Sequence, residues 1–179
     1  MKGFASSLLI ISLFITLFSA FHLIGGGRKA AQAKAFETQA KLILGSEYPD
    51  RVLSLMSQAK KRIYLCMYVA SYQKERSYAL ENRLLKALAT SYKKGVDVRV
   101  VLDASLEWDP KAGRMSGPRS KKNDKAYGYL KSQGVPVRYD SLEQTMHAKS
   151  LVIDEDLVVM GSTNWTYSAL KKNVDSYSQ

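Results

Sequence analysis

Two short apolar runs near the end of the chain, residues 150–153 and 157–160, constrain its fold more than any other feature. Only the acidic triplet Asp154–Asp156 separates them, which is typical of a tight turn, so the two runs are expected to pair as a hairpin. His147 and Lys149 stand two residues apart at the start of the first run, and residues i and i+2 share one face of a strand. Ser162 and Asn164 repeat this spacing after the second run. The hairpin would therefore bring the two polar pairs side by side.

The rest of the chain alternates between helical and extended patterns. The spacing of apolar residues predicts helices over 29–41, 51–61, 78–94 and 124–132, and strands over 63–70, 96–102 and 135–139. Such alternation predicts an α/β fold with a mixed β-sheet flanked by helices on both faces. The single cysteine, Cys66, lies within an apolar run and is expected to be a buried small hydrophobe.

The N-terminal residues differ in character from the rest. Residues 4–24 form a run of 21 residues without Lys, Arg, Asp or Glu, and roughly 20 residues suffice to cross a bilayer. We expect an uncleaved membrane anchor here; the alternative is a cleaved signal peptide, whose apolar core is normally about 7–15 residues long. Three glycines, residues 25–27, then form a linker. The predicted organisation is a hydrophobic segment with its linker over 1–27 and a catalytic domain over 28–179.

The charge of the chain favours a polyanionic partner. The chain carries 27 Lys and Arg against 16 Asp and Glu, a formal net charge of +11. Nucleic acid and an anionic membrane surface are the partners that such an excess suits. Several basic residues crowd one segment rich in Gly and Pro, over 111–125, which predicts a basic loop that follows a phosphate backbone. The candidate backbone-binding residues are Lys111, Arg114, Arg119, Lys121 and Lys122.

The two polar pairs suit chemistry at a phosphodiester. Lys149, the Ser162 hydroxyl and the Asn164 amide can hold the charge that develops on non-bridging oxygens. A neutral His147 can attack phosphorus and form a covalent intermediate. Asp175 is the candidate acceptor that fixes the other ring nitrogen of the histidine. With one cysteine and no cluster of ligands, the sequence predicts no metal and no cofactor.

The number of histidines predicts a dimer. Each half of the reaction also needs a general acid or base, yet the chain has only two histidines, and His22 lies inside the apolar segment. The second imidazole must then come from another copy of the chain. We therefore expect a homodimer with its active site on the two-fold axis and the two His147 side chains in alternating roles.

The pattern His147-x-Lys149-x4-Asp154-x6-Gly161-Ser162-x-Asn164 resembles the HKD motif of the phospholipase D superfamily. A single copy behind an N-terminal hydrophobic segment resembles the small nuclease branch, which includes exported bacterial endonucleases and Zucchini-like proteins of animal mitochondria. The resemblance implies a phospholipase D-like fold, metal-free phosphodiester chemistry, a structural role for Asp154, and a body on the exported, periplasmic side. The charges that flank residues 4–24 instead slightly favour a cytoplasmic body.

Two departures from that family pattern concern the end of the chain. Asp175 stands where the family usually has a Glu, and is one methylene shorter. The sequence ends at Gln179, where relatives continue into another strand and helix, so the resemblance implies a domain that is truncated at its C-terminus.

Three functions remain open from the sequence. The leading one is cleavage of DNA or RNA, with single strands preferred, because the variable segment 111–125 is polar, Gly-rich and cationic. The second is hydrolysis of phosphatidyl or cardiolipin lipids, and the third is nucleic-acid binding at the membrane without catalysis. Among the aromatic residues, Trp165 and Tyr167 are expected to pack in the core or at its rim. Those that could line a substrate groove are Tyr68, Tyr72 and Trp108.

Overall fold

A computed structural model of the chain describes residues 39–172. The hydrophobic segment 4–24, almost all of the helix expected over 29–41, and Asp175 lie outside the described residues. Between residues 39 and 172, none of the helices has the length and apolar character needed to cross a bilayer.

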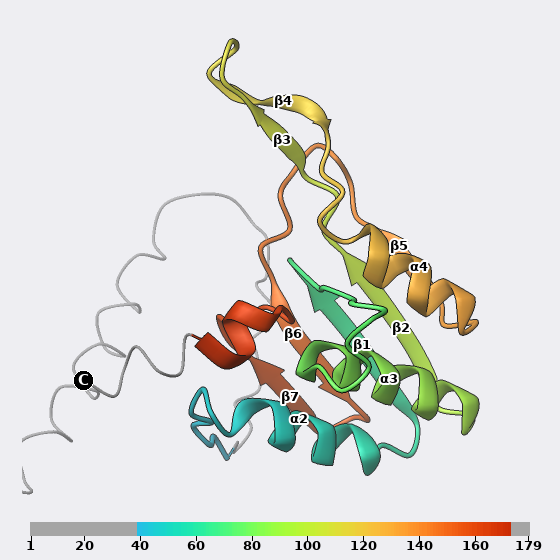
Figure 1. Ribbon diagram of the computed structural model, residues 1–179. Coiled ribbons are helices and arrows are strands. Elements are labelled where there is room, and N and C mark those ends of the chain that lie inside the picture. The colour runs from blue at the N-terminus through green and yellow to red at the C-terminus, as the bar shows by residue number, and fades with distance from the viewer. Residues whose placement is uncertain (1–38, 173–179) are drawn as a thin grey trace, which may run out of the picture. The chain divides into compact units, whose positions relative to one another are not determined.

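A five-stranded mixed sheet forms the centre of the fold (Figure 1). Its strands run in the order β5-β2-β1-β6-β7, so β1 is central. β1 pairs in parallel with β2 and antiparallel with β6, and β6 pairs antiparallel with β7 in the predicted hairpin. The strands are β1 (Arg62–Met67), β2 (Asp97–Leu102), β5 (Val137–Tyr139), β6 (Lys149–Ile153) and β7 (Leu157–Met160). The predicted α/β class with a mixed sheet is confirmed.

Three α-helices cover one face of this sheet (Figure 1). They are α2 (Tyr48–Ser57), α3 (Leu80–Lys93) and α4 (Asp124–Ser132). Two successive parallel connections, β1-α3-β2 and β2-α4-β5, step in the same direction along the sheet, and right-handed crossovers then place both helices on the same side. α2 packs on α3, and a final turn of helix, η2 (Ser168–Lys172), contributes Leu170 to the same core. Within residues 39–172 the helical cover is on this face, so helices on the second face stay a prediction.

The side chains of β1 show how the sheet divides. Ile63, Leu65 and Met67 are buried under the helices, whereas the alternate residues point to the other face and are half-buried. Cys66 belongs to that second face and is only half-buried, so the expectation of a buried small hydrophobe was wrong. Trp165 is completely buried and its indole N–H donates to the Tyr48 hydroxyl at 3.1 Å, which confirms its predicted place in the core.

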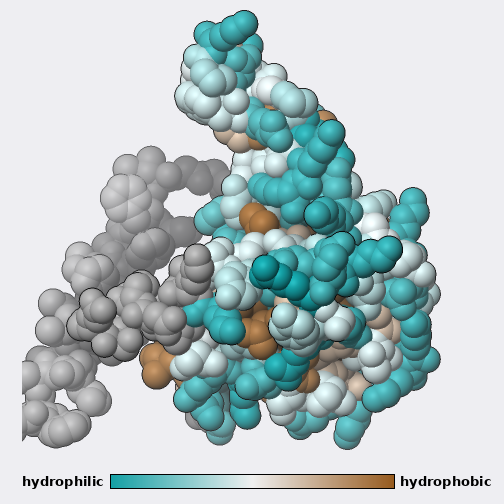
Figure 2. Space-filling view, viewed as in Figure 1, coloured by the Kyte–Doolittle hydropathy of each residue, from teal (hydrophilic) through white to brown (hydrophobic). Residues whose placement is uncertain are grey.

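The expected basic loop is a β-hairpin followed by the start of α4. β3 (Leu106–Asp109) and β4 (Arg114–Arg119) pair antiparallel and project from the body of the domain (Figure 1). The Asp109 carboxylate accepts hydrogen bonds from the Lys111 and Ala112 amides at 2.9 and 3.2 Å, and Gly113 adopts a positive φ of 63°. Glycine and proline therefore mark the turn and the edge of a hairpin here, not an irregular loop. The projecting hairpin is mostly hydrophilic (Figure 2).

Asp154 has the structural role that the family resemblance implies. It adopts a positive φ of 53° in the β6–β7 turn, which Asp tolerates better than most residues. Its carboxylate accepts hydrogen bonds from the amides of Lys60, Lys61 and Arg62 at 2.7–3.2 Å. These N–H donors, that of Lys61 first, hold the pKa of Asp154 below its usual range. Asp154 thus fastens the turn to the beginning of β1.

Candidate active site at the edge of the sheet

The strand directions bring the predicted reactive residues to one edge of the sheet. β1 and β2 end at this edge, and β6 begins there because it runs antiparallel to β1. Lys149 is the first residue of β6, and His147 lies two residues before it. The Tyr68 amide donates to the Ala148 carbonyl at 2.9 Å, so the pairing of β1 with β6 continues to the histidine.

An aromatic ring stands at the centre of this site. The rings of Tyr68 and His147 lie 4.4 Å apart between centroids, at an interplanar angle of 59°. Two ammonium groups lie over the same tyrosine ring, that of Lys122 at 3.7 Å and that of Lys149 at 4.8 Å from its centroid. An exposed imidazole therefore shares one aromatic neighbour with two cations.

Lys149 is unusual for a lysine because its side chain is almost fully buried, with 8 % of the residue exposed. Its ammonium donates to the His147 carbonyl at 2.7 Å. Burial lowers the pKa of Lys149, the nearby Lys122 ammonium lowers it further, and Asp103 opposes both effects. Such a desolvated cation interacts more strongly with an incoming anion than an exposed lysine would.

Asp103 is buried beneath the two lysines at the end of β2. Its Oδ2 accepts from the Lys122 ammonium at 2.7 Å and from the Ser105 hydroxyl and amide, and its Oδ1 accepts from the Met146 amide at 2.8 Å. Burial alone would raise the pKa of this carboxyl, but the hydrogen bonds from Lys122 and Ser105 outweigh burial and lower it. Asp103 is therefore a fixed anion that positions Lys122 and the backbone just before His147.

Asn123 ties three segments together behind the site. It is completely buried; its Oδ1 accepts from the Ala70 amide at 2.8 Å, and its Nδ2 donates to the carbonyls of Tyr68 and Asp103, both at 2.9 Å. The ends of β1 and β2 are thus joined to the start of α4 through one side chain.

The second polar pair follows β7 and crosses the same edge of the sheet. The Gly161 amide donates to the Lys149 carbonyl at 3.2 Å, and four residues later the Trp165 amide donates to the Val69 carbonyl at 2.9 Å. Ser162 and Asn164 lie between these two anchors, so the segment passes from the start of β6 to the end of β1. The Asn164 Oδ1 is buried and has no hydrogen-bond partner among residues 39–172.

The structure separates the five predicted basic residues. Lys111 and Arg114 lie on the projecting hairpin, and Lys121 is exposed in the segment just before α4. The Arg119 guanidinium forms a bidentate ion pair with Asp124 at 2.8 and 3.1 Å. Of the five, only Lys122 is brought to His147 and Lys149.

The aromatic residues that were considered for a groove also separate. Tyr68 is in the site, but Tyr72 stacks on Tyr129 at 4.3 Å. Trp108 lies on the hairpin with 58 % of its surface exposed. Tyr167 is an exposed aromatic residue, with 36 % of its surface accessible, and does not pack against the core.

Sequence reasoning missed Asp103, Ser105 and Asn123. A usable signal existed for the first two, because they directly follow an apolar strand, and polar side chains after parallel strands collect at the carboxyl edge of the sheet. Asn123 carried no such signal, since its role depends on three segments that are distant in the sequence.

A mixed sheet that presents an imidazole, two lysines and an amide at one edge defines an α/β protein equipped to bind and react with phosphoryl groups. The chain belongs to the phospholipase D superfamily: residues 52–178 match the family described as "Cardiolipin synthase, PLD-like domain". The resemblance drawn from the HKD motif is therefore confirmed.

Curated relatives and solved structures agree with this family. The chain is 31 % identical over 124 residues to the mitochondrial cardiolipin hydrolase of Xenopus tropicalis. This alignment covers 69 % of the chain and 49 % of the relative. It thus spans about half the length of the curated relatives it matches. Nuc from Salmonella typhimurium, a phospholipase D family member, has a TM-score of 0.50 at 26 % identity and covers 72 % of this chain and 80 % of Nuc. NucT from Helicobacter pylori shares the fold, with a TM-score of 0.53 at 18 % identity. The match covers 72 % of this chain and 74 % of NucT.

Proposed function

We propose that the chain is a metal-independent phosphodiesterase that cleaves nucleic acid, single strands preferentially, through a covalent phosphohistidine. The observation that carries this proposal is the exposed His147 imidazole beside two ammonium groups, one of them buried, at the edge of the sheet. The nucleophile is His147, and the groups that bind the phosphoryl oxygens are Lys149, Ser162 and Asn164.

The reaction proceeds in two displacements. One ring nitrogen of His147 attacks phosphorus with its lone pair, an N–P bond forms, and the bond from phosphorus to the leaving oxygen breaks as that oxygen takes a proton. Water then attacks phosphorus and gives up a proton, the N–P bond breaks, and the imidazole is restored. Asp175 accepts a hydrogen bond from the other ring nitrogen and keeps the attacking one unprotonated.

The proton donor and acceptor is the imidazole of a second copy of the chain. Two copies form a homodimer around a two-fold axis that passes through the site, so each imidazole serves the other. Val158 and Met160 on the edge strand β7 are 58 % and 77 % exposed and offer apolar surface beside Ser162 for this contact.

Nucleic acid is favoured over lipid by the surroundings of the site. The segments that lead to it are polar and basic, and Lys111, Arg114 and Lys121 add exposed cations along one side. A lipid enzyme would need an apolar slot beside the histidine. We further propose that residues 1–27 tether a catalytic domain formed by residues 28–179 to a membrane, on its exported side.

The test uses the full-length chain in mild detergent with fluorescent single-stranded DNA and excess EDTA. We expect the wild-type chain to cleave and His147→Ala to lose activity by about 10³-fold or more, because the nucleophile is gone. Glu143→Ala, a change at an exposed residue of the loop before the site, is the matched control and should cleave normally. Equal cleavage by the His147→Ala chain would refute the role of the histidine.

The alternatives give different results in the same experiment. Hydrolysis of cardiolipin vesicles without cleavage of DNA or RNA would replace the nucleic-acid substrate by a lipid. Binding of DNA without turnover of either substrate would leave a nucleic-acid binder. Size-exclusion chromatography with light scattering tests the dimer, and a monomer that cleaves DNA would contradict the shared site.

A further inference from the structure

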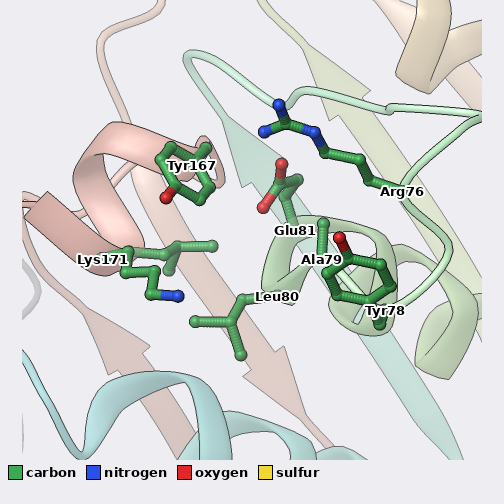
Figure 3. Close-up of a pocket in the computed structure, with 8 residues that line it drawn as sticks. Arg76, Tyr78, Ala79, Leu80, Glu81, Tyr167 and Lys171 are labelled. Carbon is green, nitrogen blue, oxygen red and sulfur yellow. The ribbon is translucent and has the colours of Figure 1, made fainter.

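A cavity lies between η2 and the loop that leads into α3. Its volume is about 350 Å³, and Figure 3 shows the residues that line it. Tyr167 and Lys171 come from the C-terminal wall, while Arg76, Tyr78 and Glu81 come from the opposite wall. None of these residues takes part in the chemistry proposed above.

Glu81 is the unusual residue of this cavity, because it is completely buried. Its Oε1 accepts a hydrogen bond from the Gln73 side-chain amide at 2.8 Å. Its Oε2 is buried and has no partner among residues 39–172. In Figure 3 the carboxylate points into the space between Tyr167 and Arg76. A buried acceptor without a partner is costly, so it indicates a ligand that donates a hydrogen bond.

The walls around this carboxylate add aromatic rings and positive charge. Tyr167 and Tyr78 are 36 % and 79 % exposed. The Arg76 guanidinium and the Lys171 ammonium lie 5.9 and 6.0 Å from the centroid of the Tyr167 ring, both exposed to solvent. No ion pair joins Glu81 to either cation in the described part of the chain. An acceptor in the floor, rings in the walls and cations at the rim suit a flat ring that carries an amine and a neighbouring phosphate.

We propose that this cavity binds a nucleobase with an exocyclic amino group, next to the scissile phosphate of a single strand. The amine donates to the Glu81 Oε2, the ring stacks on a tyrosine, and Arg76 and Lys171 contact the flanking phosphates. Oε2 has less than 1 Å² of exposed surface, so a side chain of the cavity wall must shift as the base enters. The inference rests on the proposed nucleic-acid substrate and deepens it to a preference among bases.

The backbone places the cavity within reach of the site. Tyr167 follows Asn164 by three residues, so their Cα atoms are at most about 11 Å apart. The two walls are joined where Ala70 and Trp165 form a β-bridge, with the Ser71 amide donating to the Trp165 carbonyl at 2.8 Å. A strand whose phosphate lies at His147 can therefore insert a nearby base.

The chemistry of the bases predicts the direction of the preference. Cytosine presents an amino group where thymine presents a carbonyl oxygen. The amine would donate to the Glu81 carboxylate, whereas the carbonyl would meet it as a second acceptor. Cytosine should therefore bind more tightly than thymine, although the two rings have similar size.

The test measures binding by fluorescence anisotropy, with labelled hexamers of dC and of dT in EDTA. The full-length chain carries His147→Ala so that the DNA stays intact. We expect oligo(dC) to bind about tenfold more tightly than oligo(dT), the effect of one hydrogen bond to a charged group. Glu81→Gln replaces the free acceptor by an amide that can donate, so the preference should vanish or reverse. Glu75→Gln, at an exposed acid outside the cavity, is the control and should keep it.

The outcomes separate this inference from the proposed function. Equal affinities for the two hexamers, or a preference that survives in Glu81→Gln, would overturn the base site whether or not the chain cleaves DNA. If the chain with His147 intact cleaves no strand, the proposed function is overturned. The hexamer affinities then still decide whether the cavity binds a base. The comparison of dC with dT in the chain with Glu81 intact needs no folded Glu81 variant.

Discussion

Replacing Asn123 by Ala should destabilise the domain severely, because one buried side chain joins three segments. The change removes the hydrogen bonds to the Ala70 amide and to the carbonyls of Tyr68 and Asp103. Loss of each hydrogen bond costs about 1 kcal/mol, and each buried group left without a partner adds to this cost. The free energy of unfolding should therefore fall by roughly 3–5 kcal/mol. This is a large share of the roughly 5–15 kcal/mol that stabilises a typical domain.

The measurement is urea unfolding at neutral pH, followed by the fluorescence of the buried Trp165. Lys125→Ala changes an exposed residue of α4, the helix that follows Asn123, and should alter the free energy of unfolding by less than about 0.5 kcal/mol. A loss below about 1 kcal/mol for Asn123→Ala would refute the reasoning, since water would then satisfy the three backbone groups.

Asn123→Asp adds a pH dependence to this prediction. The new carboxylate would face two carbonyl oxygens, so folding raises its pKa above that of the unfolded chain. The protonated carboxyl can still donate to one carbonyl. The variant should therefore be least destabilised in acid, below the unfolded-state pKa, and lose stability as the pH rises through the folded-state pKa. A destabilisation that does not change with pH would contradict the assigned contacts.

Two further predictions concern a structural and a reactive residue. Asp154→Asn should lower the melting temperature at neutral pH, and the difference from wild type should shrink as the pH falls below the ordinary carboxyl pKa of 3.8. The reason is that the folded-state pKa of Asp154 is depressed, so its stabilising effect is lost when it is protonated. A scan of melting temperature against pH measures this, and a constant difference would contradict it. Lys122→Met should lower kcat/KM for single-stranded DNA by roughly ten- to a hundredfold, since it removes a cation beside Tyr68 and leaves Asp103 buried without its ion pair. Lys121→Met, at the exposed neighbour, should change kcat/KM little, and equal losses in the two variants would indicate general charge attraction instead.

Much of the fold could be predicted from local sequence patterns. The helix over residues 124–132 and the strand over 157–160 have the predicted bounds, because capping, glycine and apolar spacing are local signals. The helix predicted over 51–61 instead begins at Tyr48, where Pro49 is favourable in the first turn. The prediction of a basic loop over 111–125 was wrong because turn residues indicate where the chain bends, but not whether the flanking residues pair with each other.

The site divides in the same way. His147 and Lys149 are close in sequence and belong to a spaced motif, so their common location could be predicted. Asp103 and Lys122 meet because the end of β2 and the segment before α4 lie at the same edge of the sheet. Lys149 is buried beside Tyr68, which follows β1 and is distant from it in the sequence. Non-local contacts of this kind leave no periodic pattern in the sequence.

The order of the strands also determines when the chain can fold during synthesis. The central strand β1 pairs with β6 residues that follow it by more than 80 positions, and its turn anchor, Asp154, is equally late. One edge of β1 therefore stays open until β6 has left the ribosome, and an open apolar edge invites pairing with other chains. Nascent chains of this protein should accordingly depend on chaperones until the β6–β7 hairpin emerges, because that hairpin completes the pairing of β1.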